Sequence, residues 1–162
     1  MKRILGIDPG FAATGWGVID VYGSRFKHVD HGYINTVPAD KEGNRLNTIY
    51  KKLGGIIDEF KPDFAGIEEI FFARNKLSAI PVAQAKGVIL LALERKAVTT
   101  KAFTPLQIKQ ALTGNGRAEK KQVQNMVTLL LGLSEDIKPD HAADALAAAI
   151  CFQNSTAIGD LT

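Results

Sequence analysis

Apolar residues in the first third of the chain follow the short period of β-strands and predict three strands in a row. Residues 4–7 form an unbroken apolar run that ends at Asp8, and a Pro-Gly pair then turns the chain. The second strand is expected over residues 15–21, and alternating apolar positions over residues 25–35 predict the third. Strands joined by such short connections form an antiparallel meander.

The spacing of apolar residues changes after Glu42. Positions three and four apart predict an amphipathic helix that stops before Pro62, and residues 64–67 then predict a short buried strand leading into Glu68 and Glu69. Residues 75–96 predict a helix that is apolar on nearly every side. Such a helix lies in a core or between subunits, so we expect a homodimer.

The remaining third alternates once more between strand and helix patterns. Residues 97–103 predict a fifth strand, and Thr104-Pro105-Leu106-Gln107 has the order of a helix start, with a capping threonine and an early proline. Further helices are expected over residues 118–131 and from about Pro139 to Asn154.

This order of elements predicts one α/β domain over residues 1–155. Its sheet should be mixed and five-stranded, with three antiparallel strands followed by parallel strands and helices on both faces. Residues 156–162 are expected to form a frayed C-terminal tail.

Composition supports this picture and excludes several classes of protein. The chain has 162 residues, of which 46% are hydrophobic and 23% charged, and this balance suits one globular domain. Its apolar runs are too short for a membrane span or a signal peptide, so we expect a cytoplasmic protein without membrane contact. The single cysteine, Cys151, excludes an internal disulfide and a cysteine-rich zinc site.

Charge is distributed unevenly along the chain. Residues 70–121 contain ten basic residues and two acids, a net charge of +8, whereas the whole chain carries +3 and the remainder therefore −5. Such a segregation is typical of proteins that bind a phosphate backbone, although basic helices are also often plain solvated faces. Charge alone leaves both interpretations open.

Candidate chemistry gathers at three places. Asp8 and Glu68 end two strands that can lie side by side, and Asp140, His141 and Asp144 open the last helix, where residues three and four apart share a face. Oxygen ligands from two strands and one helix describe a magnesium or manganese site. Two such ions about 3.5 to 4 Å apart would activate a water and steady the leaving oxygen of a phosphodiester.

Each of these acids also has a simpler interpretation. Asp8 can cap the Pro-Gly turn, Asp140 can cap the last helix, and Glu68 can lie at a solvated strand end. A lone histidine such as His141 is more often an ordinary surface or core residue than a metal ligand. Their joint occurrence favours the metal site.

Four motifs in order resemble the bacterial Holliday-junction resolvases of the RuvC family, which have a ribonuclease-H-like fold. The motifs are Ile7-Asp8-Pro9-Gly10 with Thr14-Gly15-Trp16-Gly17, then Ile67-Glu68-Glu69-Ile70-Phe71, then Ala118-Glu119-Lys120-Lys121-Gln122-Val123-Gln124, and His141-Ala142-Ala143-Asp144-Ala145-Leu146. The resemblance implies a homodimeric nuclease that nicks two opposing strands of a four-way DNA junction during recombination and repair. It also implies cooperation with the branch-migration proteins RuvA and RuvB.

The resemblance further implies a role for individual acids. Asp8, Glu68 and Asp144 match the catalytic acids of the family, which hold two Mg²⁺ ions, with Mn²⁺ able to substitute. Where many members carry an acid, this chain has His141, which we expect to be the fourth ligand, with Asp140 in reserve. Because a protonated imidazole cannot bind metal, activity should then fall as pH drops through about 6.5.

Basic and aromatic residues complete the implied site. Lys109 and Lys120 match basic residues that the family needs near the cleaved strand, where lysine can neutralise charge on phosphate. Phe71 matches an aromatic residue that stacks on a base. The remaining candidates for DNA binding are Arg74, Lys76, Arg117 and Lys121.

Three other functions also fit parts of the pattern. The glycine-rich return after Asp8 resembles the phosphate loop of sugar kinases and actin-like ATPases, which need a second lobe. A non-catalytic DNA-binding module would explain the basic window and leave the acids without a role. A ribonuclease acting on RNA-DNA hybrids would share the acids and need no dimer.

Overall fold

The computed structural model describes residues 1–69 and 76–159, without the side chains of residues 76, 78 and 157–159. Five strands and five helices follow one another along these residues. They are β1 (Lys2–Asp8), β2 (Ala13–Tyr22), β3 (Arg25–Asn35), α1 (Glu42–Phe60), β4 (Phe64–Glu68), α2 (Lys76–Arg95), β5 (Thr99–Phe103), α3 (Pro105–Thr113), α4 (Lys120–Leu130) and α5 (Asp140–Gly159).

The strands form a single five-stranded sheet in the order β3-β2-β1-β4-β5. The pairs β1–β2 and β2–β3 are antiparallel, whereas β1–β4 and β4–β5 are parallel. The predicted mixed sheet with its antiparallel meander is thus confirmed. Helix α1 precedes β4, and α2 connects β4 to β5, because parallel neighbouring strands need a long crossover connection.

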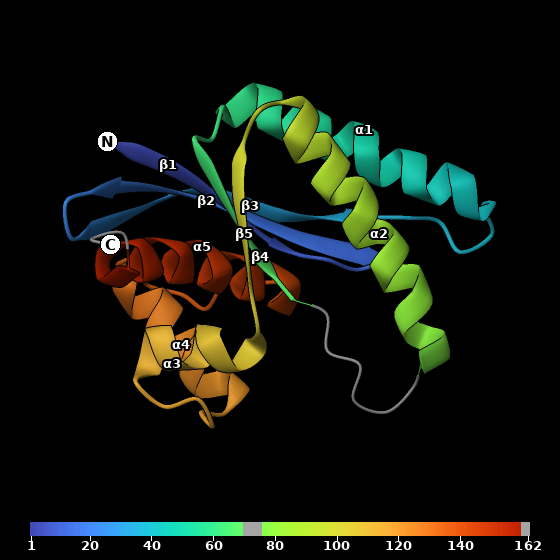
Figure 1. Cartoon of the computed structure of the whole chain (residues 1–162). Helices are drawn as coiled ribbons and strands as arrows, with labels where there is room; N and C mark the ends of the chain where they lie inside the picture. The colour runs from blue at the N-terminus through green and yellow to red at the C-terminus, as the bar shows by residue number, and fades with distance from the viewer. Residues whose placement is uncertain (70–75, 160–162) are drawn as a thin grey trace.

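Helices cover both faces of this sheet (Figure 1). On one face α1 and α2 pack over Leu5, Ile7 and Val18. On the other face α5, with α3 and α4 beyond it, packs over Ile4 and Ile19. Successive side chains of a strand point to opposite faces, so the apolar run of β1 serves both cores.

Helix α2 has one buried and one exposed apolar side. Ala85, Ile89 and Leu93 are buried in the core shared with α1, whereas Ile80 and Leu91 are 55% and 53% exposed. The helix therefore lies at the surface of the single chain and not inside its core. None of the helices in the described ranges 1–69 and 76–159 is long and apolar enough to cross a membrane.

The helical start at Thr104 has the predicted form. The Thr104 hydroxyl accepts a hydrogen bond from the backbone N–H of Gln107, whose side chain in turn accepts one from the N–H of Thr104. This reciprocal cap fixes α3 directly after the edge strand β5. It thereby sets the position of Lys109, one turn further along the helix.

The C-terminal end of α5 differs from the expectation. The helix continues past Asn154 to Gly159, so the tail predicted to fray from residue 156 is helical as far as residue 159. Asn154 Nδ2 donates to the Ala111 carbonyl 3.1 Å away, and the Phe152 ring packs on Phe64. These contacts hold the last turns of α5 against α3 and the sheet, which the local sequence did not reveal.

Candidate active site

Asp8 and Glu68 lie next to each other because β1 and β4 are parallel neighbours. The register pairs Ile7 with Ile67, and each strand ends one residue later at its acid. The carboxyl ends of parallel strands form one edge of a sheet, where ligands collect in open α/β folds. The predicted juxtaposition of the two strand ends is confirmed.

Two glycines allow α5 to bring a third acid to this edge. A Cβ atom on Gly6 would stand 1.7 Å from the Ala145 carbonyl oxygen, and one on Gly15 would stand 2.0 Å from that of His141. Any other residue at either position would push the helix away from the sheet. The close approach puts Asp144, in the first turns of α5, over the ends of β1 and β4.

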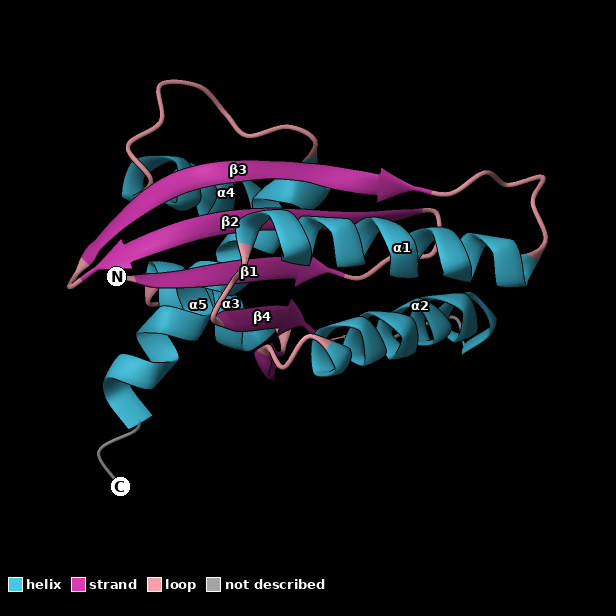
Figure 2. Ribbon diagram, turned by 90° about the horizontal axis from the view of Figure 1, so that it is seen from above, coloured by secondary structure: helices cyan, strands magenta, loops and turns pink. Residues whose placement is uncertain are grey.

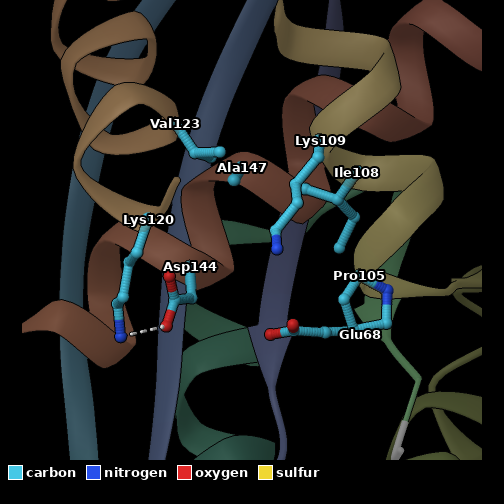
Figure 3. A pocket seen from close by; sticks show the side chains of 8 residues that line it. All are labelled: Glu68, Pro105, Ile108, Lys109, Lys120, Val123, Asp144 and Ala147. Atoms are coloured by element: carbon cyan, nitrogen blue, oxygen red, sulfur yellow. Dashed lines mark ion pairs between the residues drawn. The ribbon is translucent and has the colours of Figure 1, made fainter. Parts of the chain in front are cut away.

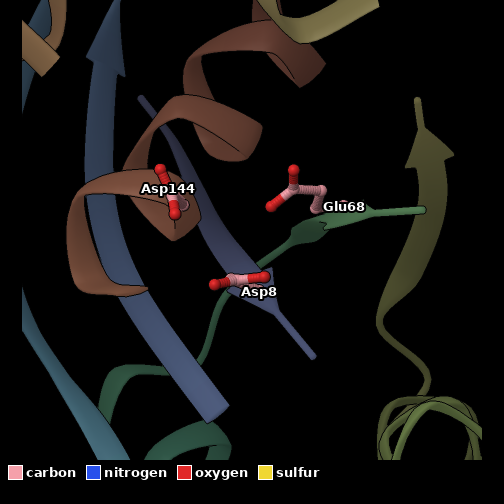
Figure 4. Close-up of side chains that lie close together, drawn as sticks. All are labelled: Asp8, Glu68 and Asp144. Atoms are coloured by element: carbon pink, nitrogen blue, oxygen red, sulfur yellow. The ribbon is translucent and has the colours of Figure 1, made fainter. Parts of the chain in front are cut away.

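The side chains of Asp8, Glu68 and Asp144 converge on one point (Figure 4). Each offers a carboxylate oxygen, and these oxygens all lie within 4.8 Å of one another. The Asp8 and Asp144 side chains are only 18% and 25% exposed. Three acids are thus held together in a region largely shielded from water.

Burial of the cluster raises the pKa of all three carboxyls. Burial raises the pKa of Glu68 to about 8, and the charge of Asp8 and a hydrogen bond to it add to the effect. Burial also raises the pKa of Asp8 to about 6, although the hydrogen bond from Glu68 opposes the rise. Burial also raises the pKa of Asp144, although the positive charge of Lys120 lowers it. The cluster therefore holds a proton at neutral pH unless a cation replaces it.

Two lysines face the cluster across a cavity of about 220 Å³ (Figure 3). Lys120 Nζ, from the first turn of α4, lies 3.3 Å from Asp144 Oδ2 and 3.6 Å from Asp140 Oδ2. Burial lowers the pKa of Lys120, but the neighbouring carboxylates outweigh it and the pKa lies above its ordinary value. Lys109, from α3, lines the same cavity and points toward the acids.

His141 and Asp140 point in different directions. His141 Nδ1 lies 3.0 Å from Asp8 Oδ2, whereas Asp140 faces Lys120. His141 is 52% exposed and stands outside the group of three acids whose oxygens meet within 4.8 Å. A ring nitrogen that donates to Asp8 has no lone pair for a metal, so ligation through Nδ1 would require that hydrogen bond to break.

The donor set suits a hard divalent cation. Three carboxylates bring negative charge and oxygen ligands to one point, and Mg²⁺ and Mn²⁺ prefer oxygen ligands. A bound cation would also offset the burial and the neighbouring negative charges that raise the pKa of Asp8 and Glu68. Asp8, Glu68 and Asp144 are therefore the residues placed to hold a metal ion in the part of the chain that the structure describes.

The remaining candidates for DNA binding are placed unevenly around the site. Arg117 is exposed in the turn before α4, and Lys121 forms an ion pair with Asp136, at 2.5 Å. Phe71 and Arg74 lie outside the described residues, as does the side chain of Lys76.

The structure separates two neighbouring acids that the sequence leaves equivalent. Glu68 enters the cluster, whereas Glu69 forms an ion pair with Lys86 of α2, and its backbone N–H donates to the Phe103 carbonyl. Thr14, which belongs to the first motif but had no assigned role, is fully buried, and its hydroxyl bonds to both backbone groups of Gly10 in the loop after Asp8. The sequence places this threonine at a core position of a strand, where a polar side chain needs a hydrogen-bond partner, and this could have indicated its role.

Comparison with known proteins identifies related chains over nearly the full length. The sequence model described as "Crossover junction endodeoxyribonuclease RuvC" matches residues 4–152. The protein of that name from Caldicellulosiruptor saccharolyticus is 49% identical over 150 residues, which are 92% of this chain and 90% of the relative.

Solved structures agree with the sequence match. Thermus thermophilus RuvC superimposes with a TM-score of 0.91 at 34% identity, covering 97% of this chain and 96% of the other. The same protein in complex with a Holliday junction substrate gives a TM-score of 0.90 at 32% identity, covering 98% and 97%. The fold, the acids at the sheet edge and these matches agree, and the chain belongs to the crossover junction endodeoxyribonuclease RuvC family.

Proposed function

We propose that this protein is a structure-selective DNA endonuclease that resolves Holliday junctions by nicking two opposing strands, in homologous recombination and DNA repair. The observation that carries the proposal is the cluster of Asp8, Glu68 and Asp144, faced by Lys109 and Lys120. The structure of a relative with the same fold, at 32% identity, is known in complex with a Holliday junction substrate.

The acids serve as ligands of two Mg²⁺ ions, for which Mn²⁺ substitutes. Asp8, Glu68 and Asp144 would hold the metal, and His141, which contacts Asp8, is the proposed fourth ligand. When bound, the metal pair supplies an activated water and stabilises the leaving oxygen of the phosphodiester.

The two lysines act on the DNA strand that lies over the acids. The raised pKa of Lys120 keeps its ammonium group charged at any physiological pH. Lys109 approaches the cavity from the opposite helix, so the two charges flank a phosphate placed above the metal ligands. Fixed positive charges there stabilise the extra negative charge of the transition state. Arg117 and Lys121 add contacts to the phosphate backbone further out.

The protein works as a homodimer through the outer side of α2. Ile80, Leu90 and Leu91 are exposed along this helix, on the side away from the core. A second copy would bury them and place a second cluster of acids on the other side of a four-way junction. Two sites related by symmetry account for paired nicks on opposing strands.

The family resemblance supports the two remaining assignments. RuvA and RuvB, which move the branch point, are proposed as functional partners. A cytoplasmic location is proposed because the DNA substrate of such an enzyme lies there.

The test is cleavage of a synthetic four-way junction beside a linear duplex and an RNA-DNA hybrid, in Mg²⁺ and in Mn²⁺. We expect paired nicks in opposing strands of the junction alone. Asp8→Asn should abolish cleavage while leaving junction binding within about twofold. Asp58→Asn, at an exposed acid of α1 on the other face of the sheet, serves as the matched control and should cleave normally.

Two results would contradict the proposal. Cleavage of the hybrid at the rate of the junction would indicate a ribonuclease. Junction binding without cleavage in either metal would indicate a DNA-binding module.

A further inference from the structure

The loop of residues 9–12, between β1 and β2, is the segment that must hold Asp8 in place. Asp8 is the last residue of its strand, paired with Gly15, and the backbone turns directly after it. On its inner side the loop is fixed by Thr14, whose hydroxyl donates to the Gly10 carbonyl at 2.7 Å. A loop without strand pairing needs further contacts if the carboxylate it follows is to stay in one position.

Thr36 provides such contacts from the end of β3. Its backbone N–H donates to the Ala12 carbonyl at 3.0 Å, and its hydroxyl donates to the Phe11 carbonyl at 2.7 Å. Thr36 is only 7% exposed. Two successive carbonyls of the loop are thus bound by one residue.

Arg45, in the first turn of α1, completes this arrangement. Its Nε donates to the Thr36 hydroxyl at 2.8 Å, so that hydroxyl both accepts and donates. The guanidinium carbon also lies 3.9 Å from the centre of the Phe11 ring. Arg45 therefore reaches the loop twice, once through Thr36 and once by stacking, which orients a planar guanidinium.

The surroundings of Arg45 argue against a direct contact with DNA. A hollow of about 310 Å³ beside it is lined by Phe11, Asp40, Glu42 and Pro81. The two acids would repel a phosphate backbone. The positive charge of Arg45 is thus directed to the loop and not to nucleic acid.

We propose that Arg45 and Thr36 are positioning residues that fix the loop after Asp8 and thereby the geometry of its carboxylate. In Figure 2 the loop between β1 and β2 runs beside α1, the helix that carries Arg45. Neither residue touches the reacting atoms. The effect on cleavage rests on the proposed function, whereas the effect on metal binding does not.

The test compares Arg45→Gln and Thr36→Val with the wild type in two assays. Calorimetric titration of the free protein with Mg²⁺ should show a dissociation constant about tenfold higher in each variant. Cleavage of the junction at saturating Mg²⁺ and DNA should be about 10- to 100-fold slower, since a small misplacement of a reacting group costs that much. The dissociation constant for the junction should stay within twofold.

Three further variants sharpen the test. Arg25→Gln removes the same charge from an exposed position at the start of β3 and should behave as wild type. Arg45→Lys keeps the charge but loses the planar group, so it should remain impaired. Because Arg45 acts largely through Thr36, the double variant should lie within about threefold of the worse single variant.

The outcomes separate this proposal from the proposed function. An unchanged Mg²⁺ dissociation constant in both single variants would overturn the positioning role. Weaker junction binding that accounts for the whole loss of rate would also overturn it, by assigning Arg45 to a phosphate contact. If the wild type binds Mg²⁺ but does not cleave the junction, the proposed function fails while the effect of Arg45 on metal binding stands.

Discussion

Glu68→Gln should make the metal-free protein more stable while abolishing cleavage. In the folded protein burial raises the pKa of Glu68 to about 8, against an ordinary value of 4.5. At pH 7 the unfolded chain has released this proton, whereas the folded chain must keep it or bear a buried charge beside Asp8. At about 1.4 kcal/mol per pH unit between 4.5 and 7, this costs on the order of 3 kcal/mol of unfolding free energy.

A neutral amide of the same shape avoids that cost. For a chain of this size, roughly 3 kcal/mol corresponds to a melting temperature about 6 to 12 °C higher. The extra unfolding free energy of Glu68→Gln relative to the wild type depends on pH. Because the folded state binds the proton more tightly, wild-type stability falls as pH rises from about 4.5 to about 8. The gain of Glu68→Gln should therefore vanish near pH 4.5 and level off above pH 8.

The assay is thermal unfolding followed by circular dichroism in EDTA at pH 5, 6, 7 and 8. Glu59→Gln, at an exposed glutamate of α1, is the matched control and should leave the melting temperature unchanged. Adding Mg²⁺ should stabilise the wild type more than Glu68→Gln. A Glu68→Gln protein that melts at or below the wild-type temperature at pH 7, or whose gain is the same at every pH, would refute the reasoning.

Three further predictions concern other parts of the molecule. If His141 ligates metal, the pH-rate profiles of the wild type and His141→Asp should differ in acid, beyond the loss that protonation of Asp8 and Glu68 causes in both, and identical profiles would exclude this role. The Arg3 guanidinium, bonded to both oxygens of Asp20, lowers the pKa of that carboxyl. Its stabilisation is therefore present above about pH 4 and lost in acid, so Asp20→Asn should cost about 2 kcal/mol in urea unfolding at pH 7 and progressively less below pH 4. Leu91→Glu, on the outer side of α2, should shift the protein from dimer to monomer in sedimentation velocity, and an unchanged dimer would remove α2 from the interface.

The sequence by itself determined the order of the elements and the ends of the strands. Short unbroken apolar runs before Asp8 and before Glu68, each bounded by turn residues or charges, predict buried strands that end where the chain leaves the core. Local signals of this kind also specified the capped start of α3 at Thr104. Such features depend on residues close together in the chain, so a single sequence is enough to read them.

The tertiary structure decided which acids meet and what that does to them. Asp144 joins Asp8 only because α5 lies directly on Gly6 and Gly15, a contact between residues more than a hundred positions apart. The same packing turns His141 toward Asp8 and leaves Asp140 facing Lys120.

Burial and long-range contacts account for the remaining differences. Glu68 and Glu69 are neighbours in sequence, yet one is enclosed by the cluster and the other pairs with Lys86 of α2. Arg45 reaches the loop after Asp8 through the side chain of Thr36 and by stacking on Phe11, both distant in sequence from Arg45. The raised carboxyl pKa values depend on distant segments that together exclude water, and the position of the loop depends on contacts with distant side chains. A local pattern of residues encodes neither.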